Sequence, residues 1–262
     1  MGNSKTSMAS LDKNELEQLQ QHYRLAVDVS EHRELSLAFA ELLQPERALP
    51  FLQRVGAFWE TDSMTATVSL FAKRYAYLTI AAGLYAMSRY NKGLDLTLEN
   101  GSLESYLQGE AWLPKALLVN TNVSCPDDGK RAEWRDEVLK RMFAGNLARV
   151  WAALSQMTGI SQAVLWENTA IYVYWLYENQ FADGADQQQR LQVEADYRYL
   201  VQDAPAHLFA QRSNPLQKFD SPKRITAVSD TPIRVRKTCC FYYLAADEPD
   251  DYCPTCPKLK HG

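Results

Sequence analysis

Apolar residues recur with a helical period through the first two thirds of the chain, over residues 11 to about 181. In the first segment Leu16, Leu19, Tyr23 and Val27 follow one another at spacings of three and four residues, as on one face of an amphipathic helix. Further helices are predicted over residues 33–43, from Pro45 or Pro50 to 59, and over 63–90, 134–154, 162–180 and 186–201. The pattern therefore predicts a mainly α body.

Individual residues support the bounds of these helices. Thr158-Gly159 is able to end the helix over 134–154, because glycine takes the left-handed conformation that stops a helix, and Ser161 is able to cap the next one. The helix over 63–90 is expected to be largely buried, with Lys73, Arg74 and Arg89 flanking its most apolar part.

A small sheet is expected to interrupt the helices. Leucines alternate with polar residues over 94–98 and lead to Asn100-Gly101, a dipeptide that favours the turn of a β-hairpin. Residues 117–119 are predicted to add another strand. The expected fold class is mainly α (α+β), a helical body with a small β-sheet and a short, loop-rich C-terminal unit.

The composition changes beyond Pro205, where prolines recur and helical periodicity stops. In the last helix before this point, Leu191, Tyr197 and Leu200 are expected to face inward. The predicted organisation is a disordered N-terminus over residues 1–10, an α-rich body over 11–204 and a C-terminal unit over 205–262.

Composition and charge describe an ordinary globular chain. It has 262 residues, 46% of them hydrophobic, and a net charge of -4, which does not favour nucleic acid as a partner. Residues 1–10 lack the apolar core of a secretion signal, and the apolar stretch over 75–87 is too short to cross a bilayer. We therefore expect a cytoplasmic protein without an integral membrane segment. Gly2 and Thr6 formally match an N-myristoylation pattern, but a disordered start is the preferred interpretation.

The cysteines are the clearest sign of chemistry. Cys239 and Cys240 are adjacent, and after twelve residues Cys253 and Cys256 follow with a two-residue gap. Such a gap lets two sulfurs face one metal centre, and a second pair is needed to close the site. The adjacent pair favours an iron-sulfur cluster, and structural zinc and redox-active or uncoordinated thiols remain alternatives. Cys125 stands alone and is interpreted as a small buried residue.

A basic segment precedes these cysteines. Between residues 212 and 237 there are seven lysines and arginines against Asp220 and Asp230. Arg234, Arg236 and Lys237 could stabilise a reduced, more negative cluster or attract an acidic electron donor; the alternative is a solvated basic loop. The histidines show no metal-ligand spacing, and no nucleotide or flavin fingerprint is present.

The residues over 236–243, Arg-Lys-Thr-Cys-Cys-Phe-Tyr-Tyr, and over 253–257, Cys-Pro-Thr-Cys-Pro, resemble the C-terminal signature of FhuF-type ferric siderophore reductases. The sequences over 165–168 and 214–216 are also similar to that family, whose α-rich body resembles the C-terminal part of siderophore synthetases. The resemblance covers about residues 60–257. The spacing between the cysteine pairs is two residues longer than is usual in the family, and a loop insertion of that size should be tolerated.

The resemblance implies a [2Fe-2S] cluster on Cys239, Cys240, Cys253 and Cys256, and a reductase that passes one electron to siderophore-bound iron(III) and releases iron(II). It also implies a ferric siderophore, with the hydroxamate type favoured. Because no nucleotide or flavin fingerprint is present, an external electron donor such as a ferredoxin or a reductase is expected. Trp166 and Asn168 are candidate pocket residues, with helix packing as the alternative. The competing functions are a siderophore-binding accessory module with structural zinc and an electron-transfer protein without its own substrate.

Overall fold

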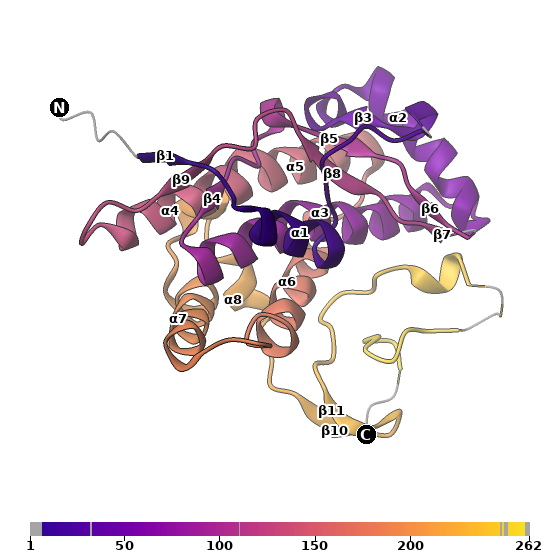
Figure 1. The fold of residues 1–262 in the computed structure, drawn as a ribbon. Helices are drawn as coiled ribbons and strands as arrows, with labels where there is room; N and C mark the ends of the chain where they lie inside the picture. The colour runs from indigo at the N-terminus through magenta and orange to yellow at the C-terminus, as the bar shows by residue number, and fades with distance from the viewer. Residues whose placement is uncertain (1–6, 32, 110, 247, 249–250, 260–262) are drawn as a thin grey trace.

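The computed structural model describes residues 7–31, 33–109, 111–246, 248 and 251–259 (Figure 1). Most of the predicted disordered start, including the Gly2 motif, lies outside these residues. Ser7–Ala9 do not belong to a disordered segment, because they form strand β1 against β9 (Val123–Cys125).

Helices dominate the described chain, and the predicted mainly α fold is confirmed. The α-helices are α1 (Lys13–His22), α2 (Pro45–Gly56), α3 (Met64–Tyr90), α4 (Arg131–Met142), α5 (Ala148–Thr158), α6 (Gln162–Asn179), α7 (Gln187–Arg198) and α8 (Pro215–Phe219). Ser63 caps α3, Ser161 caps α6, and Gly159 ends α5 with a φ of 74°. These local capping signals explain why the predicted bounds of the long helices lie close to the observed ones.

Helix α3 forms the centre of the body. It contacts α2, α4, α5, α6 and α7, and Figure 1 shows it running through the middle of the fold. Nineteen of its residues are buried, including Phe71 and Tyr75. Because α3 is buried on nearly every side and an unpaired buried charge is unfavourable, we expect its charged residues to lie where a cavity or solvent reaches the helix.

Between α4 and α5, the predicted long helix contains one π turn, η5 (Phe143–Leu147). Asn146 in this turn is fully buried, accepts a hydrogen bond from the Tyr75 hydroxyl at 2.7 Å and donates one to the Leu96 carbonyl at 2.7 Å. The π turn inserts one residue into the helix and brings Asn146 to the core, where it joins α3 to the segment before the sheet.

Short strands form small sheets, as expected, but of the alternating stretch over 94–98 only Leu94 lies in a strand. The four-stranded sheet has the order β2 (Leu25–Ala26), β8 (Lys115–Leu118), β5 (Gly101–Glu104) and β3 (Leu37–Ala38). The remaining strands are β4 (Gly93–Leu94), β6 (Leu107–Gln108), β7 (Ala111–Trp112), β10 (Arg224–Thr226) and β11 (Ser229–Ile233). Strands β2 and β8 are parallel, and the other pairs are antiparallel.

Three local predictions were wrong. The expected helix over 33–43 consists of two 3-10 turns, η1 (Arg33–Leu35) and η2 (Phe39–Leu43), separated by β3. Asn100-Gly101 is not a hairpin turn, because Asn100 ends the 3-10 turn η4 (Leu98–Asn100) and Gly101 begins β5, where a Cβ would come within 2.4 Å of the Phe39 ring. Val27 lies beyond α1 and is 45% exposed.

Helix α7 is oriented by a charged residue and not by its leucine. Leu191 was expected to face inward but is 61% exposed, whereas Val193, Asp196 and Leu200 are buried at helical spacing. Leu200 lies in the π turn η6 (Tyr199–Asp203) that ends this helix. The buried face of α7 is therefore centred on Asp196.

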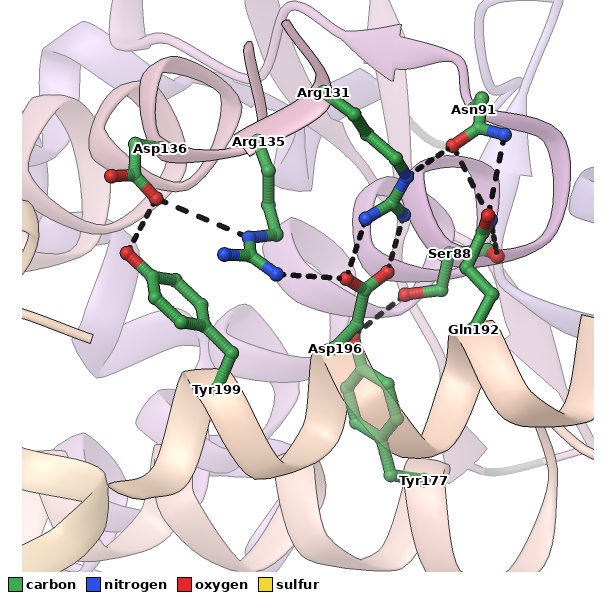
Figure 2. A network of polar contacts seen from close by, with 9 residues as sticks. All are labelled: Ser88, Asn91, Arg131, Arg135, Asp136, Tyr177, Gln192, Asp196 and Tyr199. Carbon is green, nitrogen blue, oxygen red and sulfur yellow. Dashed lines mark hydrogen bonds and ion pairs between the residues drawn. The ribbon is translucent and has the colours of Figure 1, made fainter. Parts of the chain in front are cut away.

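A polar network surrounds Asp196 (Figure 2). Arg131 of α4 binds this fully buried carboxylate through two hydrogen bonds of 2.8 and 2.6 Å, and Arg135 adds a third of 3.3 Å. Arg131 also donates to Asn91 after α3, and the Arg135 guanidinium lies 3.4 Å from the centre of the Tyr199 ring. Because a buried charge is stable only when it is paired, this network fixes α7 against α3 and α4.

The hydrophobic core continues past the predicted boundary at Pro205. Leu208 and Phe209 of the 3-10 turn η7 (Ala206–Phe209) and Leu216 and Phe219 of α8 are buried in the same cluster as the body. The more loosely packed C-terminal segment therefore begins after α8. Figure 1 shows it as the yellow trace beside the body.

Asn214 explains the motif over 214–216. Its side chain caps α8 by accepting from the backbone N–H groups of Leu216 and Gln217, and it donates to the carbonyls of Leu200 at 2.9 Å and Ala204 at 3.2 Å. One buried amide thus joins the end of the π turn to the start of α8.

We expect Asn214→Ala to lower the free energy of unfolding by about 1–2 kcal/mol, because it removes a helix cap and leaves buried carbonyls unpaired. Urea unfolding followed by circular dichroism measures this difference. Asn179→Ala is the matched control, since Asn179 is exposed and, among the described residues, its side chain bonds only to the Trp175 carbonyl; it should stay within about 0.5 kcal/mol of the wild type. Equal losses in both variants would contradict the proposed role of Asn214.

Candidate metal centre

The two cysteine pairs come together in the C-terminal segment. The Cys240 and Cys253 sulfurs are 3.7 Å apart, although thirteen positions separate them in the sequence. Cys240 and Cys256 are only 1% and 2% exposed, and Cys239 and Cys253 are half-buried. The chain between the pairs therefore loops back, as the spacing predicted.

The thiols interact electrostatically with one another and with nearby cations. The hydrogen bond with Cys253 lowers the pKa of the Cys240 thiol to about 4, with help from Lys73 and Arg236, and the same bond raises the pKa of Cys253. Burial raises the pKa of Cys239, as do the neighbouring thiols of Cys256 and Cys240. The four sulfurs thus form one interacting group beside positive charge.

Glu167 of α6 holds the backbone immediately before the first cysteine pair. Its buried carboxylate accepts the backbone N–H of Lys237 at 2.6 Å and that of Thr238 at 2.7 Å, and it also accepts the Thr238 hydroxyl. Carboxylates that receive several such bonds form strong, directional anchors. Glu167 therefore fixes the position of the backbone just before Cys239 relative to the helical body.

Arg236 connects the body to both cysteine pairs. Its side chain is 3% exposed, donates to the Asn168 side-chain oxygen at 2.6 Å and lies 3.6 Å from the Glu167 carboxylate. Its backbone N–H donates to the carbonyl of Thr255 at 2.9 Å, and Thr255 lies between Cys253 and Cys256. Asn168 in turn donates to Ser69 of α3.

The chain reverses direction directly after the first pair. Phe241 has a φ of 58°, a left-handed conformation that is rare for a bulky residue, and its N–H donates to the Cys239 sulfur at 3.4 Å. Its side chain packs against the hydrophobic core. The following 3-10 turn, η8 (Tyr242–Leu244), is tied to the body by the Thr61 hydroxyl, which donates to the Leu244 carbonyl at 2.9 Å.

The residues predicted for docking have varied surroundings. Arg234 pairs with Glu178 at 2.9 Å and Asp220 at 3.1 Å, and the Lys237 ammonium donates to a backbone carbonyl at 2.5 Å. Trp166 is 3% exposed and packs edge-on against a core phenylalanine, Phe209. Asn168 and Arg236, by contrast, reach the wall of a cavity.

This cavity opens beside the cysteines and has a volume of about 440 Å³. Its wall contains a thiol, four cationic side chains and three aromatic rings, and in full consists of Arg24, Lys73, Arg74, Tyr77, Asn168, Ile171, Tyr172, Trp175, Arg236, Cys253 and Thr255. The sequence did not identify Arg24, Lys73 or Arg74 as site residues. The usable signal was the pair Lys73-Arg74 inside an otherwise apolar helix.

The donor set fits an iron-sulfur cluster. The contact between the Cys240 and Cys253 sulfurs joins two cysteine pairs from separate stretches of chain, and a [2Fe-2S] cluster takes four thiolates over two irons. Lys73 and Arg236 supply positive charge, and the N–H of Phe241 supplies a hydrogen bond to sulfur. Within the described residues, no three or more His, Cys, Asp or Glu side chains form a group that could hold a single metal ion.

Cys125 lies elsewhere. It belongs to β9 and lines a different cavity, of about 360 Å³, with Trp134 and Val138.

None of the helices described here has the length and apolar character needed to cross a membrane.

Comparison with protein families gives two matches. The family described as "Ferric iron reductase FhuF-like transporter" matches residues 69–227, and the "FhuF 2Fe-2S C-terminal domain" matches residues 236–258. No curated protein matches the chain. The second match covers all four clustered cysteines and favours the iron-sulfur interpretation over zinc or uncoordinated thiols.

Proposed function

Because the chain belongs to the FhuF family of ferric iron reductases and has that family's 2Fe-2S domain, we propose that it reduces iron(III) bound in a siderophore and thereby releases iron(II). Oxygen chelators of the siderophore type hold iron(III) far more tightly than iron(II), since the smaller, more charged ion is the harder acid. Reduction is therefore the step that frees the metal.

In this proposal Cys239, Cys240, Cys253 and Cys256 hold the [2Fe-2S] cluster. When bound, the cluster supplies one-electron redox chemistry. The residues of the chain do the rest: Glu167 anchors the backbone before the first pair through Lys237 and Thr238. No general acid or nucleophile is needed for this reaction.

One observation carries the proposal. Cys253 lines the cavity of about 440 Å³, so a ligand in that cavity lies against one of the proposed cluster ligands. Cavities of this volume are typical of small-molecule sites, and electron transfer requires the donor and the acceptor to be close. The geometry thus supports a substrate site next to the redox centre.

Three finer points stay predictions. The reaction is expected in the cytoplasm. The electron is expected to come from an external protein such as a ferredoxin or a reductase, since the sequence has no nucleotide or flavin fingerprint. The third point is the type of siderophore: the resemblance favoured hydroxamates, whereas the cations and aromatic rings of the cavity favour catecholates, as argued below.

The test uses the full chain, purified without oxygen and reduced with dithionite, which is then removed. A ferric siderophore and an iron(II)-specific trap are added, and visible absorption follows both the cluster and the trapped iron(II). We expect the reduced protein to be reoxidised in step with iron(II) release. Oxidised protein is the control and should release none.

Two results would contradict the proposal. A reduced cluster that is not reoxidised by any ferric chelate would indicate an electron-transfer protein without its own substrate. A colourless preparation that contains zinc would indicate a binding module with a structural metal.

A further inference from the structure

The cavity beside Cys253 contains positive charge that the protein does not balance. Among its described wall residues there is no aspartate or glutamate. Arg236 is paired with Glu167, but Arg24, Lys73 and Arg74 form no ion pair with any described residue within 4.0 Å. Cations that face the same cavity without a carboxylate create a strong local field for an anion.

Arg24 and Arg74 are close enough to repel each other. Burial lowers the pKa of the Arg24 guanidinium, and the charge of Arg74 lowers it further. The Nε atom of Arg74 is buried and has no hydrogen-bond partner among the described residues. The repulsion between two like charges and the unpaired N–H donor both raise the free energy of the protein. A bound anion would offset the repulsion and accept the hydrogen bond.

The backbone holds Arg24 in this position. Its φ is 54°, in the left-handed region that is unfavourable for a residue other than glycine. Its carbonyl accepts the N–H of Ala116 at 2.9 Å, where β2 pairs with β8. Strain of this kind persists only where the surrounding structure enforces it, and here it directs a cation to the cavity.

Aromatic rings form the other part of the wall. The Tyr77 ring lies 5.4 Å from Tyr172 and 6.5 Å from Trp175, centroid to centroid, and Trp175 is 42% exposed. The Arg24 guanidinium lies 5.6 Å from the Tyr77 ring centre. Aromatic rings that line a cavity beside cations favour a ligand that is both flat and negatively charged.

We infer that this cavity binds ferric chelates with aryl arms and net negative charge, the tris-catecholates of iron(III), in preference to neutral tris-hydroxamates. The inference rests on the proposed function and names its substrate class. Each catecholate arm carries two negative charges and each hydroxamate arm one, so the iron(III) complexes are a trianion and a neutral molecule. Of the two complexes, only the trianion neutralises the unpaired cations of the cavity. Only the catecholate complex has aromatic arms, which stack on the rings of the wall.

The test measures binding without reduction. Gallium(III) replaces iron(III) in a tris-catecholate and in a tris-hydroxamate, because gallium keeps the charge and shape of the complex but is not reduced. Each complex is titrated into the full chain by calorimetry. We expect the gallium tris-catecholate to bind at least about tenfold more tightly and to lose affinity as salt is added.

Variants identify the residues responsible. Arg74→Gln and Lys73→Gln should each weaken tris-catecholate binding about three- to tenfold, and Arg74→Lys should retain most of the affinity. Arg54→Gln is the matched control, since Arg54 is an exposed cation on α2 that does not line the cavity. Thermal unfolding of each variant identifies any that fail to fold. If one of Arg74→Gln and Lys73→Gln does not fold, the binding measured with the other tests the inference.

The outcomes separate this inference from the proposed function. Equal binding of the two gallium complexes, or equal losses in Arg74→Gln and Arg54→Gln, would overturn the inference even if iron(II) is released from ferric chelates. Loss of affinity only for an acidic ferredoxin would overturn it too, and would assign these cations to the electron donor. If neither ferric chelate releases iron(II), the proposed function is contradicted. The gallium titration still decides separately whether the cavity binds tris-catecholates.

Discussion

Serine in place of any one of Cys239, Cys240, Cys253 and Cys256 is expected to remove essentially all of the [2Fe-2S] cluster. A hydroxyl is a poor ligand for iron in such a cluster, and one of the two irons would keep only one of its two thiolates. Iron and acid-labile sulfide content and the visible spectrum of anaerobically purified protein measure the loss. The helical body should keep its circular dichroism, because the sulfurs lie outside its main core.

Cys125→Ser provides the matched control for these four variants. Cys125 is a half-buried cysteine of β9 in the sheet with β1 and β4, so this change removes a thiol without touching the C-terminal segment. It should leave the cluster content unchanged. Loss of the cluster in this variant, or its retention in any of the other four, would require a different set of ligands.

Glu167→Ala is expected to be the most damaging substitution outside the cysteines. It leaves the buried Arg236 without its carboxylate and removes the acceptor from two backbone N–H groups and a hydroxyl. Breaking a buried ion pair in this way costs about 3–5 kcal/mol. Outer-sphere anchors of metal sites are worth about 10- to 100-fold in metal retention, so the variant should lose its cluster correspondingly faster to an iron chelator.

Two further variants separate positioning from simple loss of stability. Glu167→Gln keeps an acceptor oxygen without the charge and should restore part of the cluster retention. Glu137→Ala removes a carboxylate from an exposed pair with Arg141 and should change stability by less than about 1 kcal/mol. If Glu167→Ala releases its cluster no faster than Glu137→Ala, then other contacts position the segment before Cys239.

The long helices were predictable because their ends carry local signals. Ser63, Ser161 and Asp186 each cap the helix that follows, and Gly159 ends one. Predictions failed where a distant partner decided the structure. Leu191 is exposed because Asp196, and not the leucine, faces α4.

The candidate site was predictable only in part, for the same reason. Cys239, Cys240, Cys253 and Cys256 could be proposed as ligands from their spacing alone, since all four lie within eighteen residues of one another. The cavity is assembled from α3, α6, the C-terminal segment and the residue before β2, and no short window of sequence contains that arrangement. The basic segment was visible, but the partners that balance Arg234 and Arg236 were not.

The network around Asp196 bears on what happens to the fold when the cluster is absent. Its two arginines, Arg131 and Arg135, join α7 to α4 by contacts that involve no thiol and no residue of the C-terminal segment. Local stability follows local contacts, so the body should stay folded while the cysteines are empty. Damage by oxygen would then be confined to a short tail on an intact scaffold. We therefore expect a chain that has lost its cluster to accept a new one without refolding its helical body.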